Sequence, residues 1–144
     1  MIKGVKIKQL TRHTDNRGYF EEILRMDDDL LKEFGQASIS MTKPGIIKAF
    51  HWHKNQDDVF HVLEGKALVV LYDLKSKKKM IIKMDSEDPK ILFIPKGVAH
   101  GYKALGKKPL KMLYLMNKTY NAKKPDEQRI DFNDKKINFN WEKY

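Results

Sequence analysis

Short apolar runs separated by turn-forming residues recur along the whole chain. In these runs β-branched, aromatic and aliphatic side chains often alternate with polar ones, which is the pattern of strands. The expected strands are Ile2–Leu10, Tyr19–Arg25, Ala37–Thr42, Gly45–Trp52, Val59–Leu63, Ala67–Asp73, Lys79–Met84, Ile91–Ile94 and Leu110–Met116. Glycine, proline, asparagine or aspartate lies between most of them, as turns require. Many short strands at regular spacing predict an all-β sandwich or jelly roll.

One segment has the pattern of a helix. Three aspartates from Asp27 precede the apolar pair Leu30 and Leu31, and Gly35 can end the segment. We therefore expect one short helix at Asp27–Phe34. With 144 residues and no internal repeat or linker, the chain has the size of one domain. Residues 1–144 are expected to form a single domain.

The composition is 41% hydrophobic and 33% charged residues, as in soluble globular proteins. No tract is long and apolar enough to span a bilayer, and the N-terminus does not resemble a signal peptide, so we expect no membrane contact and a cytoplasmic location. Cysteine is absent, which excludes disulfides, thiolate metal sites and cysteine nucleophiles. Any chemistry must come from histidine, tyrosine, lysine, arginine and carboxylates.

The net charge of +10 favours anionic partners. Lysine runs such as Lys75–Lys79 are interpreted as solvated turns. No basic helix or repeat of aromatic and basic residues indicates a nucleic-acid reader. A small anionic ligand, such as a nucleotide diphosphate, fits the charge.

Histidines are concentrated in one block. His51 and His53 are two apart, so both side chains project from one face of an extended strand, and His100 follows a Pro-Gly turn in a second block. The spacing resembles the two-part motif of cupins, with Asp58 where glutamate is usual. Because His51, His53, Asp58 and His100 are a sound ligand set for Zn, Fe, Ni or Mn, a metal-dependent cupin enzyme is one hypothesis.

A second resemblance extends over nearly the whole chain. Six segments are similar, in order, to motifs of the dTDP-4-dehydrorhamnose 3,5-epimerase family. They are Asp15–Glu22 (DNRGYFEE), Gln36–Ser40, Gly45–His51, Ile94–Tyr102 (where the family motif ends in phenylalanine), Met112–Glu127 and Ile130–Trp141. The resemblance implies a cupin-type jelly roll and a metal-free enzyme without cofactor, which inverts C3, C5 or both of a nucleotide-linked 4-keto-6-deoxy sugar.

The same resemblance implies roles for individual residues. His51 matches the catalytic base and Tyr114 the acid, while Lys48 replaces an arginine near the developing enolate, and His100 can hold the carbonyl. Arg17 matches a residue that binds the diphosphate. Glu22, Gln36 and Tyr120 also match substrate-binding residues of the family. His53 is expected to contact the substrate beside them, in a sugar pocket whose residues differ from those of the family. The family's members are usually dimers that exchange N-terminal strands, so we expect a homodimer in which Ile2–Leu10 takes part.

Some residues depart from the family pattern. Asp58 occupies the place of a lysine that stabilises the enolate. The aspartate that orients the base lies beyond Tyr144 in the family pattern, so His51 loses tautomer control and basicity unless Asp131, Asp134 or a partner subunit substitutes. His51-Trp-His53-Lys54 is similar to a motif of nucleotide-sugar 3,4-ketoisomerases. That reaction and a non-catalytic sugar-binding cupin remain alternatives to the epimerase.

Overall fold

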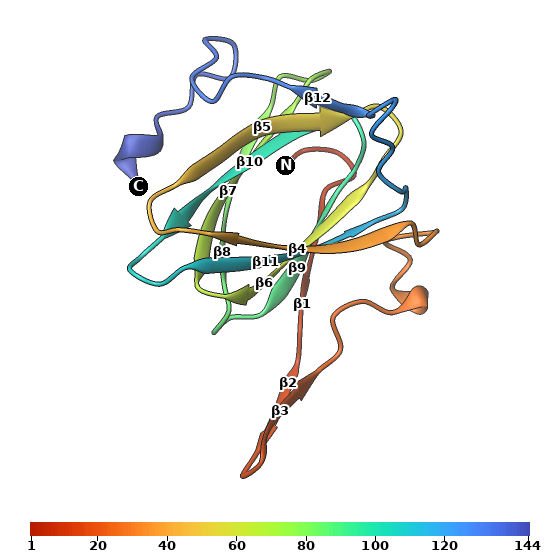
Figure 1. The fold of residues 1–144 in the computed structure, drawn as a ribbon, viewed down its shortest axis with the longest axis vertical. Coiled ribbons are helices and arrows are strands. Elements are labelled where there is room, and N and C mark those ends of the chain that lie inside the picture. Colours follow the sequence, from red (N-terminus) through yellow and green to blue (C-terminus); the bar gives the residue numbers. More distant parts are fainter.

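The computed structural model describes residues 1–144, which form two facing five-stranded antiparallel sheets and a projecting hairpin (Figure 1). The first sheet has the order β1 (Lys6–Gln9), β9 (Lys90–Ile94), β6 (Asp58–Glu64), β11 (Leu110–Met116), β4 (Gln36–Thr42). The second has the order β12 (Glu127–Arg129), β5 (Ile47–His53), β10 (Val98–Leu105), β7 (Lys66–Asp73), β8 (Lys79–Asp85). The hairpin consists of β2 (Arg12–Asp15) and β3 (Gly18–Glu21). The all-β prediction is confirmed.

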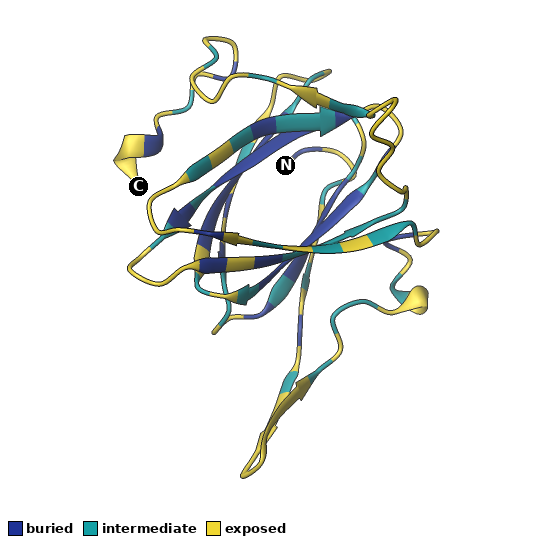
Figure 2. Ribbon diagram, in the orientation of Figure 1, coloured by how far each residue is buried: buried dark blue, intermediate teal, exposed yellow.

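The main core lies between the two sheets, where alternate side chains of each strand meet. Strand β7 is buried along nearly its whole length (Figure 2). Its side chains at Ala67, Val69 and Leu71 face the core between the sheets, and those at Leu68, Val70 and Tyr72 pack with Ile137 and Trp141 of the C-terminal segment. A strand covered on both faces is read in sequence as a continuous apolar run, which is why β7 was predicted accurately.

The helix expected at Asp27–Phe34 is absent, and that prediction is wrong. Only a single 3-10 turn, η1 (Met26–Asp28), forms before Asp29 takes a left-handed backbone conformation with φ 50°. Leu30 and Leu31 instead pack in an irregular segment against Val59, Ile91 and Phe93, on the outer face of the first sheet. Burial of this adjacent leucine pair stabilises the segment more than a short helix of low propensity could. The other short turn is η2 (Trp141–Lys143).

Three strands were not predicted, namely β2, β10 and β12. Strands β2 and β12 are short and polar, so they lack an apolar pattern and form because β3 and β5 pair with them. Strand β10 contains Gly101, a poor strand former. A Cβ at Gly101 would lie 2.2 Å from the Cβ of Ala49, so the glycine allows β10 to approach β5 closely. The expected strand Ile2–Leu10 is reduced to β1, because Gly4 has φ 85°.

None of the helices is long and apolar enough to cross a membrane.

Candidate active site

A pocket of about 610 Å³ opens between the two sheets. Its walls come from β5, β10 and β12 on one side and from β4, β6 and β11 on the other, with the segment 118–124 at the rim. Seven of the residues predicted for a site line it: Gln36, Lys48, His51, His53, Asp58, Tyr114 and Tyr120. The structure therefore brings together residues that are up to 84 positions apart in the sequence, as in the contact of Gln36 with Tyr120.

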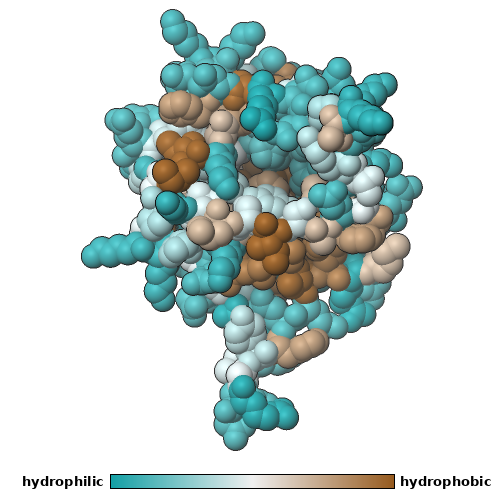
Figure 3. Space-filling model, in the orientation of Figure 1, coloured by the Kyte–Doolittle hydropathy of each residue, from teal (hydrophilic) through white to brown (hydrophobic).

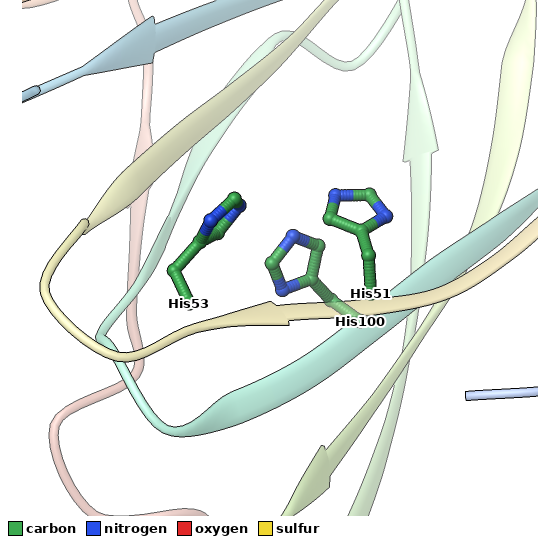
Figure 4. A group of neighbouring side chains, drawn as sticks. All are labelled: His51, His53 and His100. Carbon is green, nitrogen blue, oxygen red and sulfur yellow. The ribbon is translucent and has the colours of Figure 1, made fainter. Parts of the chain in front are cut away.

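Three histidines converge at the inner end of the pocket (Figure 4). His51 and His53 point the same way from β5, as their spacing predicted, and His100 reaches them from β10, where it is the register partner of His51. The ring centroids of His51 and His100 are 4.1 Å apart, and one nitrogen from each of the three rings lies within 4.8 Å of the others. His100 is 1% exposed and does not line the pocket, and its ring contacts that of His51 from the neighbouring strand.

Asp58 is buried beside the histidines. Its Oδ2 lies 3.3 Å from His100 Nε2 and 3.5 Å from His53 Nε2, while its Oδ1 accepts a 2.8 Å hydrogen bond from Gln56. The Nδ1 of His100 donates to the Val98 carbonyl oxygen at 2.9 Å, because a carbonyl oxygen can only accept. This bond fixes both the ring orientation and the tautomer of His100.

Burial and the two neighbouring imidazoles make His51 hard to protonate. Desolvation is the largest cause and repulsion from His100 and His53 follows; together they lower the pKa of His51 to about 2. Its lone pair is therefore free at neutral pH, as a general base requires. Burial also lowers the pKa of His53, against the opposing effect of Asp58.

Acid should destabilise the folded protein through His51. Its imidazole takes up a proton below pH 6.5 in the unfolded chain but only near pH 2 in the folded one, so stability is complete above pH 6.5 and falls as the pH drops through that window. Between pH 6.5 and 5 this loss amounts to about 2 kcal/mol. We expect His51→Asn to remove this part of the pH dependence in urea unfolding, whereas His13→Asn on the hairpin should not. Equal acid sensitivity of wild type and His51→Asn would contradict the assignment.

On the opposite wall, Tyr114 belongs to a cluster of hydroxyl groups. Its hydroxyl lies 2.7 Å from Ser40 Oγ on β4 and 2.8 Å from the hydroxyl of Tyr102 on β10. Tyr102 in turn lies 3.1 Å from Thr42 Oγ1. Burial, and then the proximity of Tyr102, raise the pKa of Tyr114 above its ordinary range, while the hydrogen bond with Ser40 acts in the other direction. Tyr114 is therefore protonated at neutral pH and can act as an acid.

The rim of the pocket carries polar and cationic groups. Gln36 Oε1 accepts a 2.9 Å hydrogen bond from the Tyr120 backbone, which ties the rim segment to β4. Tyr120 is exposed at this edge. Lys48 and Lys124 also line the pocket and make no ion pair within the chain. These two ammonium groups are available to an anionic ligand.

Two of the predicted binding residues lie outside the pocket of their own chain. Arg17 is at the tip of the hairpin with its side chain 85% exposed, and it pairs with Asp15 at 2.6 Å. Glu22 pairs with Arg25 at 3.1 Å just after the hairpin. Figure 1 shows the hairpin extending away from the two sheets. Neither side chain contributes to the pocket within a single protomer.

Some contributors to the site were missed in the sequence. They include Tyr102, Ser40, Thr42, Gln56, Asp126 and Arg129. Tyr102 could have been predicted from the sequence, because it follows His100 by two residues and therefore shares the same face of a strand. Asp131 and Asp134, proposed as substitutes for an orienting carboxylate, accept hydrogen bonds from backbone groups in nearby turns and do not line the pocket. Arg129 is the register partner of His51 on β12.

The predicted alternative metal ligands are all present at one place. His51, His53 and His100 supply three imidazole nitrogens, and the Asp58 carboxylate adjoins two of them. His53 Nδ1 and His100 Nε2 are buried without a hydrogen-bond partner. Three imidazoles and a carboxylate are a donor set that divalent transition metals accept, so the residues fit such an ion.

The arrangement of the two sheets and the histidine cluster between them define the protein as a cupin. Residues 13–128 match the family described as the polysaccharide biosynthesis C-terminal domain. The spore coat polysaccharide biosynthesis protein SpsL of Bacillus subtilis is 49% identical over 98% of this chain and 97% of its own length. The probable low-salt glycan biosynthesis epimerase Agl13 of Haloferax volcanii is 30% identical, over 97% of this chain and 94% of its own length.

A solved structure agrees with the fold. The dTDP-6-deoxy-D-glucose-3,5-epimerase of Legionella pneumophila, in complex with dTDP-4-keto-L-rhamnose, superposes with a TM-score of 0.85 at 24% identity, covering 97% of this chain and 79% of its own. The cupin-type fold predicted from the sequence is thus confirmed. The chain belongs to the polysaccharide biosynthesis C-terminal domain family, among the sugar epimerases related to dTDP-4-dehydrorhamnose 3,5-epimerase.

Proposed function

We propose that this protein epimerises a nucleotide-linked 4-keto-6-deoxy sugar at C3, C5 or both. One observation carries the proposal, namely that His51 and Tyr114 project into the pocket from opposite sheets. Inversion at carbon requires a base on one face of the sugar and an acid on the other. A neutral imidazole and a protonated phenol meet these requirements at neutral pH.

The chemistry follows from these positions. His51 takes the proton from the carbon next to the ketone, and the negative charge moves to the ketone oxygen as an enolate. Lys48, which lines the same pocket, supplies positive charge for that oxygen. Tyr114 then gives its proton to the carbon from the opposite face, which inverts the centre.

For His100 we propose a role other than holding the carbonyl. Its ring lies beside His51 on the neighbouring strand, is buried and makes a 2.9 Å hydrogen bond with the Val98 carbonyl. We assign it the positioning of His51. The low pKa of His51 weakens it as a base in the free protein, and negative charge forming on the bound sugar offsets this by favouring the imidazolium.

A nucleotide diphosphate is the anionic part of the proposed substrate. Lys48 and Lys124 at the pocket carry no intramolecular ion pair, which suits a diphosphate group. A dTDP-sugar is bound by the solved relative, and we propose the same class of ligand here. The expected absence of nucleic-acid and membrane partners and the cytoplasmic location stay predictions.

A homodimer accounts for the position of Arg17. The hairpin has no core of its own, and two isolated strands are marginally stable in water. Its Tyr19 and Phe20 are exposed, as are Ile39 and Met41 on edge strand β4. Figure 3 shows apolar side chains gathered on this face below the middle of the molecule. We propose that the hairpin packs against a second copy and delivers Arg17 and Glu22 to that copy's pocket.

Mixing two inactive variants tests this delivery. Arg17→Ala lacks the diphosphate contact and His51→Asn lacks the base, so each homodimer should have two defective sites. After subunit exchange, each mixed dimer should contain one intact site, which restores about a quarter of the wild-type sites in an equal mixture. The measurement is the epimerisation rate of the mixture against that of each variant alone. A rate equal to the mean of the two variants would contradict delivery between subunits.

A metal-dependent cupin enzyme is the second candidate, because the three histidines and Asp58 fit a divalent ion. Such an ion, when bound, acts as a Lewis acid on a substrate oxygen. We expect epimerisation to survive dialysis against a chelator, since His51 and Tyr114 transfer protons without a metal. Loss of activity on chelation, restored by one divalent metal, would favour the second candidate.

Product analysis tests the proposed reaction itself. The purified protein is incubated with dTDP-4-keto-6-deoxyglucose, and the products are identified by NMR. We expect the C3 epimer, the C5 epimer or the doubly inverted sugar. A product in which the carbonyl has moved from C4 to C3 would identify a ketoisomerase instead, and unchanged substrate that nevertheless binds would identify a sugar-binding protein.

A further inference from the structure

Four hydroxyl groups form a cluster around Tyr114. Tyr114, Tyr102, Ser40 and Thr42 come from strands β11, β10 and β4, and four hydrogen-bond contacts connect them. Tyr102 is 1% exposed and Thr42 is 2% exposed, so both hydroxyls are shielded from water. A buried hydroxyl without a partner costs free energy, and the cluster satisfies each one.

The direction of the hydrogen bonds in this cluster can change. Each hydroxyl has one proton to donate and can accept from others. With four protons and four contacts, Tyr114 can donate to Tyr102 or Ser40, and it then accepts from the other. When Tyr114 turns its proton towards the pocket, both Ser40 and Tyr102 can donate to its oxygen, and Thr42 can donate to Tyr102.

We propose that Tyr102 is a positioning residue that, with Ser40 and Thr42, stabilises the phenolate which Tyr114 becomes after giving its proton to the sugar. This inference rests on the proposed epimerase function. The O–H bond of Tyr114 breaks as the new C–H bond forms, so one negative charge passes from the enolate to the phenolate oxygen. Two donated hydrogen bonds meet that charge in a site shielded from water, where they are strongest.

Burial, and then the proximity of Tyr102, raise the pKa of Tyr114 in the resting arrangement. Either oxygen of the Tyr102–Tyr114 pair can be the donor, and rotation of the Tyr102 O–H towards Tyr114 gives the phenolate a donated hydrogen bond. The cluster thus holds the acid protonated at rest and accepts the charge once the proton has left. Neighbouring charged groups are few: Asp58 is the carboxylate that acts on Tyr114, and Lys48 lies opposite Tyr102 in the β5–β10 register.

Partitioning of the enolate provides the test. In deuterated water, return of a deuteron from His51 gives labelled substrate, whereas delivery by Tyr114 gives product. Tyr102→Phe removes one hydrogen bond to the phenolate, which should lower kcat about 10- to 100-fold with KM unchanged. The ratio of labelled substrate to product should rise by a similar factor. An unchanged ratio, with substrate exchange and product formation reduced together, would overturn the inference.

Matched variants separate this role from a structural one. Tyr72→Phe removes a tyrosine hydroxyl from the far side of β7, outside the cluster, and should leave both rates unchanged. Thr42→Val removes the hydroxyl that supports Tyr102 and should shift the ratio in the same direction, while Thr42→Ser keeps a hydroxyl and should restore it. If the wild type epimerises the sugar but Thr42→Val and Thr42→Ser give equal ratios of labelled substrate to product, the inference is overturned. A wild type without any exchange would overturn the proposed function and the inference with it.

Discussion

His51→Asn is expected to lower both deuterium exchange at the sugar carbon and product formation by about 10²- to 10⁴-fold, the usual contribution of a general base. Asparagine retains a polar side chain of similar reach but has no lone pair basic enough to take the proton. His51 lines the pocket, and burial and the neighbouring imidazoles hold it neutral. Binding of the nucleotide diphosphate should change little, so the loss should appear in kcat.

The His51→Asn experiment needs a control for folding and a control for substitution in general. Tyr72→Phe, on the far side of β7 and outside the pocket, should retain the wild-type exchange rate, and urea unfolding at pH 7 shows whether each variant is folded. Exchange by folded His51→Asn at a rate near that of wild type would exclude His51 as the base. His53, which lies beside it on β5, would then be the next residue to test.

Tyr114→Phe is expected to separate the two half-reactions. The base remains, so the substrate should still acquire deuterium, while product formation should fall by about 10²- to 10⁴-fold because the acid has gone. The ring of Phe60 packs edge to face on Tyr114 with centroids 5.0 Å apart, and phenylalanine preserves this contact. NMR of recovered substrate and product measures both quantities in one sample.

One result for Tyr114→Phe would contradict its role as the acid. If both product formation and exchange remained at the wild-type rate, another acid would protonate the carbon. Tyr144→Phe, at the exposed C-terminal end where Tyr144 stacks on Phe139, serves as the matched control and should behave as wild type. Loss of both half-reactions with loss of the folded state would show instead that the hydroxyl cluster is needed for stability.

Much of the site was predictable because successive side chains of a strand point alternately to its two faces. The spacing of His51 and His53 places both side chains on one face whatever the rest of the fold does, and the structure shows them together. Strand β11 was predicted with its bounds, and it presents Tyr114 to the pocket. The charge of Lys48 and the absence of cysteine limited the chemistry further.

Other features depend on contacts that no local pattern contains. The approach of β10 to β5 is set by Gly101 against Ala49, and the pairing of Tyr102 with Tyr114 requires knowing that β10 and β11 face each other across the interior. Leu30 and Leu31 resembled a helix in sequence but bind to the outer face of a sheet. Tertiary burial outweighed local propensity there.

Deuterium incorporation by the wild-type protein tests the central claim most directly. The protein, dialysed against a chelator, is incubated with dTDP-4-keto-6-deoxyglucose in deuterated water, and C3 and C5 are examined by NMR. Proton transfer between His51, the sugar and Tyr114 predicts deuterium at C3, C5 or both, together with an inverted product. Binding of the nucleotide sugar without any deuterium at either carbon would contradict the account.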